Sequence, residues 1–187
     1  MNEELISALA RIVANATPLI IASIGETITE RAGIINLSLD GSIVLCAMVG
    51  FMAAFVTDSL VVGMAAAMLV GAIIALIIAA ASIELKQDQV AVGFVLTLLA
   101  ADLAQFLGQE YSRIPGPQVP KWPLPVLNQI PVVGPVFFDH NVLVYISYAL
   151  VLVTWFWLFR TRRGLAHRAI GERPEAAFAR GTSVNNG

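Results

Sequence analysis

Apolar residues gather in five long runs that polar stretches separate. The runs lie near residues 5–24, 42–57, 60–83, 90–107 and 142–159. A helix needs about 20 predominantly apolar residues to cross the hydrocarbon core of a bilayer, and these runs approach or reach that length. The pattern predicts an all-α, polytopic integral membrane protein with about five transmembrane or re-entrant helices.

The composition supports a membrane location. Of the 187 residues, 58% are hydrophobic and 13% are charged, whereas soluble domains average about 25% charged residues. We therefore expect the lipid bilayer as the surroundings of this chain. A formal net charge of −2 gives no reason to expect a nucleic-acid partner, and the single cysteine, Cys46, excludes an internal disulfide.

A polar stretch between the first two runs is the main candidate for a functional segment. Residues 25–41, GETITERAGIINLSLDG, contain three acidic residues, one arginine and one asparagine. Backbone groups inside a membrane must be satisfied by the protein, so the stretch is either a loop in water or irregular backbone that lines a polar cavity. Asp40, followed by Gly41 and Ser42, predicts the capped start of the next helix, with its positive end toward the break. An ordinary capped turn is the alternative, and the stretch alone favours neither.

The two runs after this break suggest how the helices pack. Residues 42–57 are short for a full crossing, which favours a discontinuous or re-entrant helix. Residues 60–83 contain no charge and repeat a small residue at every fourth position. Small residues at this spacing let helix backbones approach closely in lipid. We expect one packing face, made by Gly63, Ala67, Gly71, Ala75 and Ala79.

The second half of the chain contains a long loop and a basic tail. Residues 108–141 hold seven of the nine prolines, so we expect extended and turn structure there. Six of the eleven Lys and Arg residues follow the last run, from Arg160 onward. An excess of basic residues beside a span marks the cytoplasmic side. We therefore expect the tail inside the cell and the 108–141 loop outside it.

Within the tail, residues 171–181 predict a short helix. Pro174 suits the first helical position, Glu175 the positive end, and Gly181 the end of the helix. Ala176, Ala177 and Phe178 predict a small apolar surface that could enter a groove on a partner. A helix lying on the membrane surface is the alternative.

The sequence excludes several kinds of chemistry. Lys86 and Lys121 are the only lysines, and neither belongs to a phosphate-binding Gly-Lys-Ser/Thr motif. His140 and His167 fall on opposite sides of the membrane in the expected topology, which argues against a metal site. No serine or cysteine has a base at a recognisable spacing. We expect no enzyme, no catalytic residue and no bound metal.

Taken together, several motifs resemble the permease subunit of a binding-protein-dependent ABC importer. The class is the one that handles simple sugars and nucleosides, and the branch that works with basic membrane lipoproteins is the most similar. The motifs occur in family order: Ala16–Ile20, Glu30-Arg-Ala-Gly33, Asn36–Gly41, Asp88–Val90 with Gly93, Ile130–Gly134, Arg163–Leu165, and Ala169–Glu172 through Ala176, Ala177 and Gly181.

The resemblance implies a transmembrane permease domain over residues 1–160 and a cytoplasmic coupling segment and tail over 161–187. The partners would be an ABC ATP-binding subunit, a second permease subunit and an external substrate-binding lipoprotein, in the bacterial cell (plasma/inner) membrane. ATP and magnesium would bind to the ATPase and no cofactor to this chain. The implied path residues are Glu30, Asn36, Ser38, Asp40, Gln89 and Thr97. The implied coupling residues are Gly171, Glu172, Pro174, Glu175, Ala176, Ala177, Phe178, Arg180 and Gly181.

The chain departs from the family pattern in three ways. Asp40 stands where such permeases usually have Glu, and Thr97 stands where the nucleoside branch often has Asn. Family members also continue for several spans beyond the coupling segment, so the chain is expected to be truncated at its C-terminus, with a partial permease fold. The expected function is half of a translocation path for a nucleoside or simple sugar. The alternative is a non-transporting membrane fragment or assembly subunit.

Overall fold

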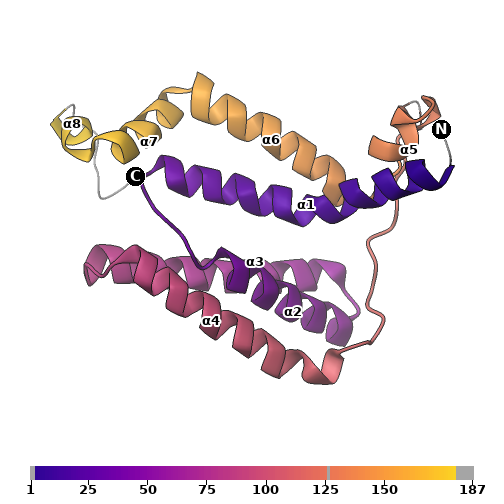
Figure 1. Ribbon diagram of the computed structural model, residues 1–187, viewed down its shortest axis with the longest axis horizontal. Helices are drawn as coiled ribbons and strands as arrows, with labels where there is room; N and C mark the ends of the chain where they lie inside the picture. Colours follow the sequence, from indigo (N-terminus) through magenta and orange to yellow (C-terminus); the bar gives the residue numbers. More distant parts are fainter. Residues whose placement is uncertain (1–2, 126, 180–187) are drawn as a thin grey trace. The chain divides into compact units, whose positions relative to one another are not determined.

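The computed structural model describes residues 3–125 and 127–179, and it is built of helices (Figure 1). Five of these helices are long and apolar enough to cross a membrane. Contacts between backbone segments group the chain into two compact units. One unit consists of residues 34–118, and the other of residues 1–33 with 119–187. This division differs from the expected boundary at residue 160, and the assignment of residues 1–160 and 161–187 as separate domains stays a prediction.

The unit of residues 34–118 contains three spanning helices, α2 (Leu39–Thr57), α3 (Leu60–Ala79) and α4 (Gln89–Gly108). A short π-helix, Ala80–Glu84, extends α3. The α2 helix packs against both α3 and α4. With its 19 residues, α2 is longer than the expected run of 42–57 because the helix begins at Leu39 rather than Ser42. It is long enough to span a membrane, and a re-entrant course for it stays a prediction. The core of this unit consists of Leu45, Ile74, Ile78, Ala100 and Ala104.

The small residues of α3 form a packing face over only part of the helix. A Cβ on Gly63 would lie 2.6 Å from the Ala54 Cβ, and Gly71 approaches the Cys46 sulfur of α2. Ala75 and Ala79, by contrast, are exposed. At 3.6 residues per turn, a repeat of four advances about 40° round the helix at each step. The stripe therefore turns away from α2, and Ile74 and Ile78 are buried in its place.

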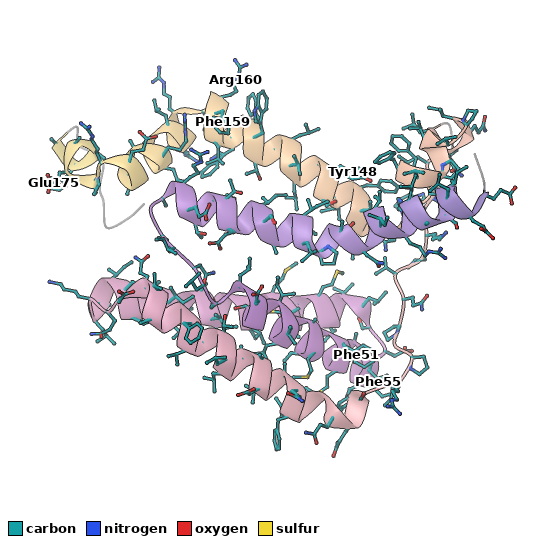
Figure 2. The ribbon with its side chains drawn as sticks, viewed as in Figure 1. Phe51, Phe55, Tyr148, Phe159, Arg160 and Glu175 are labelled. Carbon is teal, nitrogen blue, oxygen red and sulfur yellow. The ribbon has the colours of Figure 1, made fainter. Side chains whose placement is uncertain are left out.

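An aromatic cluster lies where α2 ends and the chain leaves α4. The rings of Phe51 and Phe55 are stacked, with centroids 6.1 Å apart, and Tyr111 meets Phe55 edge to face. Figure 2 shows Phe51 and Phe55 near the same end of α2. A Cβ on Gly116 would overlap the Phe51 ring, so the loop backbone packs directly on this cluster.

The other unit contains α1 (Glu3–Arg31), α5 (Val133–Phe137), α6 (Val142–Arg160), α7 (Arg162–Glu172) and α8 (Pro174–Ala179). The α1 helix packs against α5, α6 and α7. It is longer than the first apolar run because the polar residues that follow the run are helical up to Arg31. The Thr27 hydroxyl finds its partner within this part of the helix, since it donates to the Ser23 carbonyl oxygen at 2.7 Å.

The proline-rich segment is less irregular than expected. Besides extended backbone, it contains the short helix α5 and two 3-10 turns, Gln109–Tyr111 and Leu127–Gln129. The structure thus corrects the expectation of extended and turn structure alone over 108–141, since Val133–Phe137 is helical. Pro135 is tolerated because it lies in the first turn of α5, where the backbone N–H lacks a helical partner anyway. Asn141 then caps α6 by accepting from the N–H groups of Leu143 and Val144.

Candidate functional site

The polar break between the first two spans is shorter than the sequence suggested. It covers residues 32–38, because α1 ends at Arg31 and α2 begins at Leu39. Gly33 has a φ of +85°, a left-handed conformation that favours glycine and commonly ends helices. Its N–H donates to the Glu30 carbonyl oxygen at 2.9 Å. Glycine at this position thus lets the chain leave α1.

Asn36 and Ser38 fix the conformation at the end of the break. The Asn36 Oδ1 atom accepts from the Ser38 N–H at 2.9 Å and from the Ser38 hydroxyl at 2.7 Å. The Ser38 side chain is fully buried and lies 3.3 Å from the Ser42 hydroxyl. Ser38, rather than Asp40, occupies the cap position of α2, and Asp40 is exposed in the first turn. The acidic side chain therefore lies at the positive end of the helix without capping it.

One face of α4 supports the backbone of the break. Gln89 Oε1 accepts from the Ile35 N–H at 3.1 Å, and the Thr97 hydroxyl donates to the Leu37 carbonyl oxygen at 2.6 Å. Gly93 lies between them on the same face, since positions four apart are neighbours on a helix. A Cβ on Gly93 would lie 2.9 Å from the Leu37 nitrogen. Non-helical backbone is thereby given the partners that a membrane cannot supply.

The start of α2 contacts the same region of α4. A Cβ on Gly41 would overlap the Thr97 carbonyl oxygen and lie 2.7 Å from its Cα. Gly41 and Gly93 together allow the break and α4 to meet backbone to backbone. Sequence reasoning included both glycines in family motifs without assigning them this contact.

The structure brings together four of the six residues expected to line a path. Asn36, Ser38, Gln89 and Thr97 contribute to one set of hydrogen bonds in the unit of residues 34–118. Asp40 belongs to that unit as an exposed residue, and Glu30 is exposed in the last turn of α1. A lining role for these six residues stays a prediction.

The expected coupling segment is divided between two helices. Gly171 and Glu172 end α7, Arg173 interrupts the helix, and α8 begins at Pro174 as predicted for the first helical position. Arg180 and Gly181 lie outside the described residues. Phe178 is 70% exposed, whereas Ala177 is buried. The prediction of an apolar surface made by Ala176, Ala177 and Phe178 was therefore wrong for Ala177. Glu175 is also exposed (Figure 2).

Three arginines, from α1, α6 and α7, lie over aromatic rings near the end of α6. The Arg168 guanidinium is centred 4.9 Å from the Phe159 ring centroid, and that of Arg31 is 5.9 Å from the same centroid. The Arg160 guanidinium lies over Trp155 at 5.5 Å, and Figure 2 shows Phe159 and Arg160 together at this end of the helix. Such cation–π contacts hold the guanidinium groups close to the end of an aromatic-rich span.

Five apolar helices and a basic segment after the last of them describe a multi-pass membrane protein, in which side chains of α4 bind two backbone groups of the break. The sequence matches the family described as "Branched-chain amino acid transport system / permease component" over residues 8–186. The chain belongs to this family of transport permeases, and in bacteria its location is the inner membrane.

Curated relatives include permeases named for different cargoes. The chain is 35% identical to the putative glucose ABC transporter permease protein TsgC13 of Haloferax volcanii. It is 33% identical to the nucleoside ABC transporter permease protein NupC of Lactococcus lactis, and 34% identical to the guanosine ABC transporter permease protein NupQ of Bacillus subtilis. These matches confirm the resemblance to simple sugar and nucleoside ABC permeases.

The matches cover most of this chain and part of each relative. They include 90% of the chain for the glucose and guanosine permeases and 96% for the nucleoside permease. The chain spans 53%, 57% and 61% of the glucose, guanosine and nucleoside permeases, respectively. No solved structure matches the chain at a significant level.

Proposed function

We propose that this chain forms part of the translocation path of an ABC importer, with ATP hydrolysis on a partner subunit as the source of energy. The observation that carries the proposal is the polar break of residues 32–38, which is fixed on α4 between two spanning helices by Gln89 and Thr97. Irregular backbone within a membrane protein is tolerated where it lines a cavity or is buried in protein. In transporters such breaks lie near the substrate.

The proposed cargo is a nucleoside or a simple sugar. The names of the relatives support this class, and the chemistry of the break agrees with it. Both cargoes carry hydroxyl groups, and a hydroxyl group both donates and accepts hydrogen bonds. The amide, hydroxyl and carboxylate side chains near the break can therefore bind such a cargo. Glu30 and Asp40 are exposed and so available to a ligand. Gln89 and Thr97 act mainly by holding the break in position.

The proposed partners are an ATP-binding subunit, a second permease subunit and an external substrate-binding lipoprotein. No cofactor is proposed for this chain, and ATP and magnesium would bind to the ATPase. We assign the contact with the ATPase to α8. Phe178 and Glu175 are exposed on that short helix. Aromatic side chains, Phe among them, are enriched at protein interfaces, and a helix binds a partner groove through its apolar side chains.

The test is co-purification of the tagged chain with the candidate ATPase in detergent. We expect Phe178→Ala combined with Glu175→Arg to weaken the association by about tenfold or more, because truncating a residue that dominates an interface costs about 2 kcal/mol or more. The matched control is Leu165→Ala, which removes an exposed apolar side chain from α7. Unchanged co-purification of the double variant would contradict the assignment of α8.

A further inference from the structure

One face of α7 lies against the ends of two spanning helices. Gly164, His167 and Gly171 share this face because they are three and four residues apart. A Cβ on Gly164 would lie 2.7 Å from the Leu158 Cα and overlap the Trp157 carbonyl oxygen of α6. The first turn of α7 is therefore fixed to the end of α6, and Thr161 caps it by accepting from the Gly164 N–H at 3.0 Å.

The middle of this face binds the C-terminal end of α1. His167 Nε2 lies 2.8 Å from the Ile28 carbonyl oxygen, and since a carbonyl oxygen only accepts, Nε2 carries the proton. Ile28 is in the last turn of α1, where carbonyl groups lack helical partners. The Trp157 ring, 5.3 Å from the imidazole between centroids, supports the ring from α6. His167 thus caps the end of α1 from a helix 139 residues further along the chain.

The last turn of α7 meets the start of the break. A Cβ on Gly171 would overlap the Arg31 carbonyl oxygen and lie 2.8 Å from the Gly33 nitrogen. A Cβ on Gly33 would lie 3.2 Å from the Gly171 Cα, and its φ of +85° also favours glycine. The backbones of the two glycines are therefore in direct contact, without room for a methyl group on Gly171.

This contact lies beside both segments to which a function is proposed. The rest of the break follows Gly33 directly along the chain, and α8 begins three residues after Gly171, at Pro174. We infer that Gly171 and His167 are positioning residues, which transmit movement of α8 to the end of α1 and, through it, to the break. This inference rests on the proposed function. A rigid contact of two backbones transmits displacement because packed interfaces change between discrete arrangements instead of deforming continuously.

The test measures guanosine transported per ATP hydrolysed, in proteoliposomes that contain the chain with its ATPase, second permease and substrate-binding lipoprotein. We expect Gly171→Ala to lower this ratio by about tenfold, within the usual range of coupling between two sites. The matched control is Gly25→Ala, because a Cβ on Gly25 meets nothing within 4 Å, and it should leave the ratio unchanged. Thermal unfolding of each purified complex separates loss of coupling from loss of folding.

A second pair of variants keeps the inference testable if Gly171→Ala does not fold. His167→Gln retains a side-chain donor and should preserve most of the ratio, whereas His167→Phe removes the donor and should lower it. A ratio equal to the wild-type value in both Gly171→Ala and His167→Phe would overturn the inference alone. A wild-type complex that hydrolyses ATP without transporting guanosine or glucose would overturn the proposed function, and this inference with it.

Discussion

The Thr97 hydroxyl donates a hydrogen bond of 2.6 Å to the carbonyl oxygen of Leu37, 60 residues earlier in the chain. Leu37 lies in the break, where the backbone follows no helix and its carbonyl groups need other partners. The hydrogen bond assigns Thr97 a structural role that its polarity alone did not predict. Thr97 thus supports the segment that precedes α2, and its expected contact with a substrate stays a prediction.

Removal of the Thr97 hydroxyl should therefore lower stability. Thr97→Val keeps the shape of the side chain but leaves the Leu37 carbonyl oxygen without this donor, at an expected cost of about 1–3 kcal/mol. The measurement is thermal or denaturant unfolding of the detergent-solubilised protein. Thr57→Val is the control, since the Thr57 hydroxyl bonds within the exposed last turn of α2. Equal stability of the two variants would contradict the supporting role.

The close approach of the break to α4 makes a prediction about glycine. Gly93→Ala places a methyl group 2.9 Å from the Leu37 nitrogen and should destabilise the protein by about 1–3 kcal/mol, as overpacking does elsewhere. Gly71→Ala is the matched control, because its Cβ would lie at an ordinary 3.6 Å from the Cys46 sulfur. Unfolding curves of both variants provide the comparison. If Gly93→Ala left the stability unchanged, the contact between Gly93 and Leu37 would have to be looser than the structure shows.

Asn36 contributes an acceptor oxygen, which leads to a pair of opposite expectations. Asn36→Asp keeps an oxygen for the Ser38 N–H and hydroxyl and should retain the fold. Asn36→Leu removes that oxygen and leaves the Ser38 N–H without its partner, at about 1–3 kcal/mol, whereas the Ser38 hydroxyl keeps the Ser42 hydroxyl as a neighbour. Resistance of the break to limited proteolysis is the measurement. Asn36→Asp is also informative about function, since a loss of guanosine binding without loss of protease resistance would assign Asn36 to the ligand.

The rotation of the small-residue stripe on α3 predicts different tolerance along one helix. Ala67→Leu should disrupt packing at the α2 contact, where the Ala67 Cβ would lie 3.1 Å from a Cβ on Gly50. Ala79→Leu should be tolerated because Ala79 is exposed and leucine is a good helix former. Yields of folded, monodisperse protein after gel filtration compare the two variants. Equal disruption would show that the whole stripe packs.

The spans could be predicted from the sequence because each depends on local hydrophobicity, and the family could be predicted from motifs in a fixed order. The partners of the break could not, because Gln89 and Ile35 are 54 residues apart and no local pattern relates them. The extent of α1 was missed for another reason. Its last turns are polar, so the end of the apolar run does not mark the end of the helix at Arg31.

The tail was predicted less well than the spans. Pro174 marked the start of α8 correctly, since proline suits the first helical position. The helix α7 was not predicted, because its arginines were interpreted only as a topology signal. Its capping residue Thr161 and the glycines at 164 and 171 become meaningful only once α6 and α1 are known to lie against them.

The central claim is that this chain forms part of the path of an ATP-driven importer. The most direct measurement is ATP-dependent uptake of labelled guanosine and of labelled glucose into proteoliposomes that contain the chain, its ATPase, the second permease and the binding lipoprotein. The account predicts saturable uptake of one of the two that requires ATP and disappears with Phe178→Ala combined with Glu175→Arg. An assembled complex that hydrolyses ATP but takes up neither cargo would contradict it.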